Sequence, residues 1–139
     1  MMILDTNVLS ALMRTSPEAS IVRWLDVQPA QSIWITSLTL FEARFGLALL
    51  PAGKRRSAMT EAFDRLMQVD LENRVLDFDA SAATEAALLA ARRQKAGRAV
   101  DFRDTQIAGI ALARRAALAT RNVRHFQDAK LVVIDPWAA

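Results

Sequence analysis

The sequence lacks cysteine and tyrosine and contains a single histidine, His125. Without cysteine the chain can form neither disulfides nor thiolate zinc sites, and it has no cysteine nucleophile. A Ser-His-Asp hydrolase would depend on His125, and no nucleophile-elbow sequence accompanies it. Any metal site would therefore consist mostly of carboxylates, which favour hard cations such as Mg²⁺ or Mn²⁺.

Long hydrophobic runs are also missing. No stretch approaches the roughly 18 apolar residues that a membrane-spanning helix needs. The first ten residues have no basic start, and Asp5 interrupts their apolar run, so no targeting segment is recognised. We therefore expect a soluble, cytoplasmic protein with no membrane partner. The 139 residues, 53% hydrophobic and 24% charged, fit one domain spanning 1–139.

Basic residues are concentrated in one part of the chain. Between residues 92 and 124, nine Arg or Lys stand against two acids, although the net charge of the chain is only +3. This local excess suits a polyanionic partner such as RNA, whereas solvated helix faces would explain it without a partner.

Apolar periodicity predicts alternating strands and helices. Short buried strands are expected at 2–4, 32–36, 74–78, 118–120 and 131–134. Helices are expected at 6–13, near 17–29, 38–49, 59–67, 79–95 and 101–115. Strands separated by helices predict an α/β domain in which helices cover both faces of a parallel sheet of four or five strands. The order of the strands does not follow from the pattern.

The helix near 38–49 contains an acid beside apolar residues. Ser37 is expected to cap this helix, and Leu38, Phe41, Phe45 and Leu49 form one apolar stripe. Glu42 lies beside the stripe, where a buried charge is costly unless it is paired or bound to a metal. Glu42 could therefore bind a cation, or it could reach water at the edge of the helix.

Two other acids stand at predicted element ends. Asp5 follows the first strand, and ligands of parallel α/β sheets bind beyond the carboxyl ends of the strands. Asp5 could equally cap the next helix. Asp101 and Asp104 begin the helix at 101–115, where Asp101 can act as the cap and Asp104 is favoured by the helix dipole. Asp104 also stands at the mouth of a helix that must be buried, which suits a metal ligand.

Polar residues follow the strand at 118–120. Thr120 could hold a carboxylate through a hydrogen bond, and Asn122 could bind a metal or a metal-bound water. His125 is expected in local packing or at the surface.

Five segments together resemble PIN-domain nucleases, in particular the toxin half of VapBC toxin–antitoxin pairs and their FitB-like relatives. The matching segments are MILDTNVL (2–9), TSLTLFEARFG (36–46), DTQIAGIA (104–111), ATRNVRHF (119–126) and VVIDPW (132–137). They follow one another in the family's order across nearly the whole chain. The fold implied is a three-layer PIN-like domain.

The resemblance implies a metal-dependent endoribonuclease whose centre is formed by Asp5, Glu42 and Asp104. Asp5 and Asp104 would bind Mg²⁺ or Mn²⁺ directly, and Glu42 would bind through water or act as a base. The family commonly has a fourth acid after the strand at 118–120, where this chain has Asn122. This departure lowers the negative charge of the site. It bears on how tightly a second metal ion would bind, and not on the binding of the first.

We also expect roles for further residues around the centre, and protein partners. Supporting roles are expected for Asn7, Asp101, Thr120 and Asn122, and contacts with RNA for Arg98, Arg103, Arg121 and Arg124. The resemblance also implies a small antitoxin, whose tail occupies the active-site groove, and a homodimer. Apolar residues of the helices near 38–67 could supply the dimer surface.

Two alternatives fit parts of the sequence. Phosphotransfer enzymes of the haloacid-dehalogenase kind also begin with a strand ending in Asp, but they usually need a second Asp two residues later, where this chain has Asn7. The other alternative is a catalytically weak or inactive PIN-fold domain with a nucleic-acid-binding or regulatory role. The presence of Asn122 in place of an acid favours this alternative.

Overall fold

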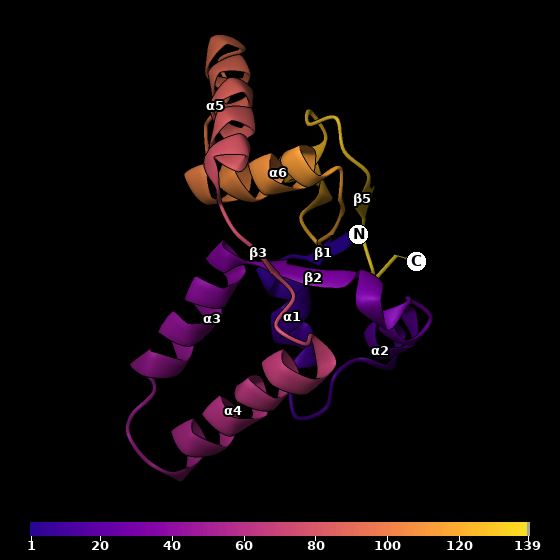
Figure 1. Ribbon diagram of the computed structural model, residues 1–139, viewed down its shortest axis with the longest axis vertical. Helices are drawn as coiled ribbons and strands as arrows, with labels where there is room; N and C mark the ends of the chain where they lie inside the picture. The colour runs from indigo at the N-terminus through magenta and orange to yellow at the C-terminus, as the bar shows by residue number, and fades with distance from the viewer. Residues whose placement is uncertain (139) are drawn as a thin grey trace.

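The structure, a computed structural model, describes residues 1–138 as alternating strands and helices (Figure 1). The strands are β1 (Met2–Leu4), β2 (Ile33–Thr36), β3 (Val75–Leu76), β4 (Ala117–Ala119) and β5 (Val133–Ile134). The α-helices are α1 (Thr6–Leu12), α2 (Ala19–Asp26), α3 (Ser37–Leu49), α4 (Lys54–Arg65), α5 (Ala80–Lys95) and α6 (Phe102–Arg114). Short helical turns of other types are η1 (Ala30–Ser32), η2 (Leu66–Asp70) and η3 (Val123–Phe126).

The five strands form one parallel sheet in the order β3-β2-β1-β4-β5. β1 lies at the centre, with Met2 opposite Ile33 of β2 on one side and opposite Ala117 of β4 on the other. Because the strands are parallel, their carboxyl ends meet at one edge of the sheet. Residues that follow β1, β2 and β4 therefore come together at that edge.

Helices cover both faces of the sheet, so the domain has three layers. Ile3 and Leu118 pack on α5 and α6, whereas their neighbours Leu4 and Ala119 belong to the core under α1 to α4. Successive strand residues point to opposite faces, which explains this division. Figure 1 shows α5 and α6 above the strands and α1 to α4 below them. The predicted α/β class with a parallel, doubly covered sheet is confirmed.

α5 and α6 approach each other closely at Gly109. A Cβ atom built on Gly109 would lie 2.5 Å from the carbonyl oxygen of Ala82 and 2.7 Å from the Cβ of Ala86. Only hydrogen at this position allows the two helices to keep their present distance.

The predicted cap of α3 is wrong by one residue. Thr36 is the N-cap, and its hydroxyl oxygen accepts a hydrogen bond from the backbone N–H of Thr39 at 3.1 Å. The Ser37 hydroxyl instead accepts a hydrogen bond from the backbone N–H of Phe78, beyond β3, at 3.2 Å. Both residues are good caps, and the sheet decides between them because β2 runs directly into the helix.

The apolar stripe on α3, treated as a buried face in the argument about Glu42, is exposed at three of its four residues. Phe41, Phe45 and Leu49 are 68%, 55% and 68% exposed. α3 packs on the core with another side, on which Thr39 and Leu47 are buried. These three residues therefore lie at the surface, whereas Leu38 packs on the core. The rings of Phe41 and Phe45 are stacked with their centroids 5.9 Å apart.

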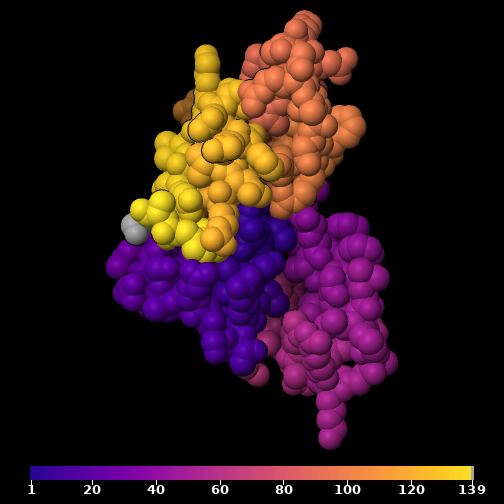
Figure 2. Space-filling view, turned by 180° about the vertical axis from the view of Figure 1, so that it is seen from behind, coloured from indigo at the N-terminus to yellow at the C-terminus, as the bar shows by residue number. Residues whose placement is uncertain are grey.

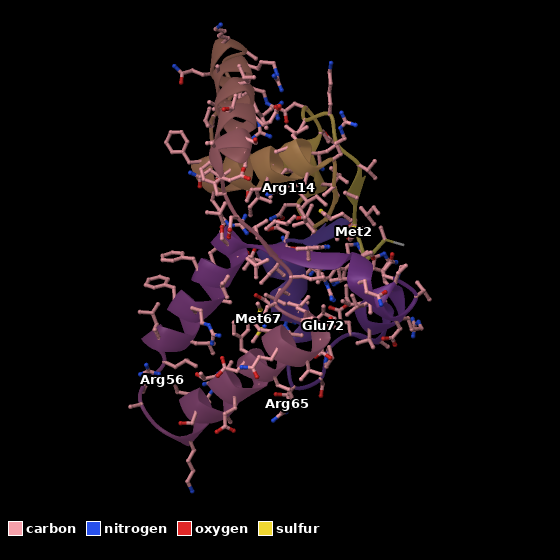
Figure 3. All side chains as sticks on the ribbon, viewed as in Figure 1. Met2, Arg56, Arg65, Met67, Glu72 and Arg114 are labelled. Carbon is pink, nitrogen blue, oxygen red and sulfur yellow. The ribbon has the colours of Figure 1, made fainter. Side chains whose placement is uncertain are left out.

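The remaining predicted strands and helices differ from expectation in their limits. β3 and β5 contain two residues each, and α4 begins at Lys54, five residues earlier than its apolar pattern indicates. Figure 3 shows Arg56 and Arg65 along this helix. Within residues 1–138, no helix is both long and apolar enough to cross a membrane.

Candidate metal centre

Three acidic side chains meet at the carboxyl edge of the sheet although they are far apart in the sequence. Asp5 follows β1 directly, Glu42 lies in the second turn of α3, and Asp104 lies in the first turn of α6. The parallel sheet brings these segments together because α3 begins where β2 ends and α6 begins beside the same edge (Figure 1).

The guanidinium of Arg103 joins the three carboxylates. Its Nε donates to Glu42 Oε1 at 2.7 Å, and its Nη2 donates to Asp5 Oδ1 at 2.7 Å. Its Nη1 donates to Asp104 Oδ1 at 2.5 Å. The three acids thus surround one positive charge, supplied by the residue that precedes Asp104.

These contacts stabilise the charged form of Arg103. Burial by itself lowers the pKa of the guanidinium, but the charge of Asp5 and hydrogen bonds to Asp5 and Glu42 outweigh burial. The pKa of Arg103 is raised above its ordinary value, so the side chain stays charged.

Asp5 is fully buried and is held by several donors. The backbone N–H of Thr6 donates to Oδ1 at 2.8 Å, and the Thr120 hydroxyl donates to Oδ2 at 2.8 Å. Asn7 Nδ2 lies 3.5 Å from Oδ2 and donates to the Thr120 hydroxyl at 3.2 Å. Such partners offset the cost of burying a carboxylate, and they also fix its orientation.

A series of hydrogen-bonded threonine hydroxyls leads to Glu42. The Thr6 hydroxyl donates to Glu42 Oε1 at 2.8 Å. Thr39 therefore donates to Thr6, at 3.0 Å, and Thr36 donates to Thr39, at 3.4 Å. Because each hydroxyl has one proton, the carboxylate at one end sets the direction of the whole chain.

Asp104 has contacts on both oxygens. His125 Nδ1 lies 2.7 Å from Oδ2, opposite the bond from Arg103 to Oδ1. Asp101 does not reach this cluster with its carboxylate, which accepts the backbone N–H of Asp104 at 2.9 Å as the N-cap of α6. We expected His125 in local packing or at the surface; its ring, although half-exposed, contacts an acid of the centre.

The other predicted site residues lie outside the carboxylate cluster. Asn122 is exposed, and its backbone N–H donates to the Thr120 hydroxyl at 3.1 Å. Arg98 forms an ion pair with Asp128 at 3.1 Å, and Arg121 stacks on the ring of Trp137. Of the four arginines expected to contact RNA, Arg103 is the one that binds the three acids.

Sequence reasoning missed the central position of Arg103 and the roles of Thr6, Thr39 and His125. A usable signal for Arg103 is its place in the first turn of a helix directly before an acid, next to a strand end with another acid. The threonines gave no signal, because their partners are 33 to 36 residues away.

Two hollows flank the centre. One, of about 440 Å³, is lined by Asp104 and by basic side chains that include Arg98, Arg124 and His125. The other, of about 610 Å³, lies between α1, α3 and α4, and reaches from Thr6 and Glu42 to apolar residues such as Leu9 and Met59. In Figure 2 the surface is hollowed along the boundary between the indigo N-terminal segment and the magenta segment that contains α3 and α4.

The donor atoms suit a hard cation, although the present arrangement does not hold one directly. Among residues 1–138, no three Asp, Glu or His side chains are placed to ligate the same ion. Each acid is hydrogen-bonded to a different nitrogen of Arg103. Mg²⁺ takes one or two carboxylates and keeps several waters, so Asp5, Glu42 and Asp104 fit a hydrated ion if the guanidinium moves away.

The protein thus combines a parallel sheet in the strand order β3-β2-β1-β4-β5 with three acids, from separate segments, at the carboxyl edge of that sheet. A model of the PIN domain matches residues 2–131. The chain therefore belongs to the PIN-domain family.

Relatives match over the full length. The plasmid stability protein StbB of Pseudomonas syringae pv. tomato is 40% identical, with 100% of both chains covered. The VapC ribonuclease Y4jK of Sinorhizobium fredii is 36% identical and covers 99% of this chain and 98% of its own. The crystal structure of FitAcB from Neisseria gonorrhoeae superposes with a TM-score of 0.92 at 30% identity, with complete coverage of both chains. The predicted resemblance to VapC and FitB is confirmed.

Proposed function

We propose that this chain is a metal-dependent endoribonuclease that acts as the toxin of a type II toxin–antitoxin system and hydrolyses RNA phosphodiester bonds. The observation that carries the proposal is the convergence of Asp5, Glu42 and Asp104 around one cation at the edge of a PIN-domain sheet. A relative that is 36% identical over nearly the whole chain bears the name of a ribonuclease, which supports the same activity.

Asp5 and Asp104 would bind Mg²⁺ or Mn²⁺, and Glu42 would bind through water or act as a general base. The ion, when bound, lowers the pKa of a water and offsets charge on the leaving oxygen. The chain's own residues orient the ligands: Thr120 holds Asp5, Thr6 holds Glu42 and His125 holds Asp104. Partners of this kind commonly affect metal affinity by about 10- to 100-fold.

The basic hollow beside Asp104 is the proposed path of the RNA backbone. Arg98 and Arg124 line it, and phosphates attract such guanidinium groups. The hollow adjoins Asp104, a proposed direct ligand, so a phosphodiester held there would lie next to the ion. Single-stranded or looped RNA fits best because its bases can turn outward, and the proposed place of action is the cytoplasm.

A small antitoxin is the proposed protein partner, and a homodimer the proposed assembly. The groove between α1, α3 and α4 is mostly apolar and ends at Thr6 and Glu42, so a segment bound in it would reach Glu42. Phe41, Phe45 and Leu49 on the outer side of α3 form a contiguous apolar strip, which is the proposed dimer surface.

Cleavage of labelled RNA tests the activity. The purified chain should cleave RNA with Mn²⁺ and lose activity when the ion is removed with a chelator. Asp5→Asn and Asp104→Asn should reduce cleavage to the background of the buffer, because each removes a charged ligand while barely changing volume. Asp26→Asn, which makes the same change at an exposed position, should keep full activity.

Circular dichroism of each variant separates a catalytic role from a structural one. Equal cleavage by the wild type and Asp5→Asn would refute the nuclease assignment. Binding of RNA without cleavage by the wild type would favour an inactive PIN-fold domain.

A further inference from the structure

We infer that Arg103 is an internal counter-ion that occupies the cation position of the centre until a divalent ion displaces it. Arg103 would then set the metal concentration at which the centre fills. The inference rests on the proposed metal-dependent function and adds to it a competitor supplied by the chain itself.

The geometry assigns each nitrogen of the guanidinium to a different acid. Nε, Nη1 and Nη2 bond to Glu42, Asp104 and Asp5, and Nη2 also donates to the Thr6 hydroxyl at 2.8 Å. The oxygens that accept these bonds are Oε1 of Glu42 and Oδ1 of both aspartates. An ion shared by the three acids would need these oxygens.

Electrostatics explains why a cation must be present. Three carboxylates held this close together repel one another, and Asp5 is fully buried. Arg103 offsets part of this repulsion in the metal-free protein. A divalent ion beside the guanidinium would meet a like charge, so the ion and Arg103 compete for the same place.

The position of Arg103 at the surface of the centre allows its side chain to move into solvent when an ion displaces it. Its side chain is 32% exposed and extends from the first turn of α6, at the surface of the centre. Asp104, the next residue, lines the basic hollow proposed for RNA. A displaced guanidinium can therefore reach solvent without any change in the backbone of α6.

A purely structural role for Arg103 makes the opposite prediction. If the guanidinium only braces the carboxylates, its removal loosens them and weakens metal binding. If it occupies the cation position, its removal frees the oxygens and strengthens metal binding. The sign of the change in metal affinity therefore separates the two roles.

The test is a titration of the full chain with Mn²⁺, followed by calorimetry or by the electron paramagnetic resonance of free Mn²⁺. Arg103→Gln should bind Mn²⁺ at least about tenfold more tightly than the wild type, because several charge-assisted hydrogen bonds no longer have to be broken. Without metal, Arg103→Gln should melt at a lower temperature than the wild type, and saturating Mn²⁺ should raise its Tm by more.

Arg114→Gln is the matched control. It removes the same charge from the C-terminal end of the same helix, where Arg114 (labelled in Figure 3) forms an ion pair with Asp79. Its Mn²⁺ affinity should equal that of the wild type. Arg103→Lys keeps the charge but carries its donors on a single nitrogen, so it cannot reproduce the separate contacts that Nε, Nη1 and Nη2 make with three acids; its affinity should lie between those of the wild type and Arg103→Gln. This variant decides the question if Arg103→Gln fails to fold.

The outcomes separate this inference from the function on which it rests. Equal or weaker Mn²⁺ binding by the Arg103 variants, with clear binding by the wild type, would overturn the inference and leave the metal centre intact. Absence of Mn²⁺ binding in the wild type and in every variant would overturn the metal centre itself.

Discussion

Thr120 shows how one hydroxyl can support a charged site. It is fully buried, donates to Asp5 Oδ2 and accepts hydrogen bonds from Asn7 Nδ2 and the backbone N–H of Asn122. Several polar groups from the ends of β1 and β4 thus depend on a single side chain. A valine here would keep the shape and remove all three bonds.

Thr120→Val should lower the free energy of unfolding by about 1–3 kcal/mol, since buried polar groups lose their partner. Its Mn²⁺ affinity should fall by roughly tenfold or more because Asp5 is no longer held in place. Urea denaturation and Mn²⁺ titration measure the two effects. Thr84→Val is the control, since its exposed hydroxyl donates to one backbone carbonyl of α5. Equal losses in both variants would argue against a special role for Thr120.

At the scale of elements, the contact between α5 and α6 depends on the absence of a side chain at Gly109. Gly109→Ala should lower the free energy of unfolding by about 1–3 kcal/mol, because the new Cβ would meet backbone atoms of α5. Gly46→Ala makes the same change on α3, where nothing lies within 4 Å of the new Cβ. It should raise the free energy of unfolding by about 0.5–1 kcal/mol. Changes of the same sign in both variants, measured by urea denaturation, would contradict the close packing described.

A buried arginine ties α5, α6 and the turn η3 together. Arg93 is 5% exposed and bonds to Asp128, to the Thr105 hydroxyl at 2.9 Å and to the backbone carbonyl of His125 at 2.7 Å. The hydrogen bond from Arg93, although opposed by burial, holds the pKa of Asp128 below its usual range. This pair therefore also steadies the backbone that carries His125 toward Asp104.

The lowered pKa of Asp128 gives stability a pH dependence of known sign. The stability contributed by ionised Asp128 is complete above the pKa that this group has in the unfolded chain. It disappears as the pH falls through the lower folded pKa. The acid limb of the stability curve, that is, the free energy of unfolding below about pH 4, should therefore fall steeply with decreasing pH. Asp128→Asn should lose on the order of 2 kcal/mol at pH 7 and show a flatter acid limb. Urea denaturation from pH 7 to pH 3 measures both, with Asp26→Asn as an exposed control. An unchanged acid limb would contradict the assignment.

At the scale of the whole molecule, the exposed strip on α3 predicts self-association. Replacing Phe41 and Phe45 together by serine should convert a dimer into a monomer, because the stacked pair supplies the largest side chains of the strip. Sedimentation at several concentrations measures the change. Val27→Ser, at an exposed position at the C-terminal end of α2 and away from the strip, should leave the dimer unchanged. A wild type that sediments as a monomer would refute the proposed assembly.

Much of the fold could be predicted from local patterns. The strand MIL before Asp5, the Ala-rich helix after Asp79 and the helix capped by Asp101 all lie within a few residues of their predicted limits. These features depend on caps and periodicities within one segment, which a sequence displays directly. The extent 1–139 of a single domain and the roles of the site residues stay predictions.

By itself the sequence determined which segments are strands and helices, which family the chain belongs to, and which acids are candidates for a metal site. The tertiary structure alone decided the strand order, the buried side of α3 and the position of Arg103 among the acids. The reason is that these depend on contacts between distant segments, such as Arg103 with Asp5, 98 residues apart. Helical periodicity shows that a face is apolar, and only packing determines whether that face meets the core or the solvent.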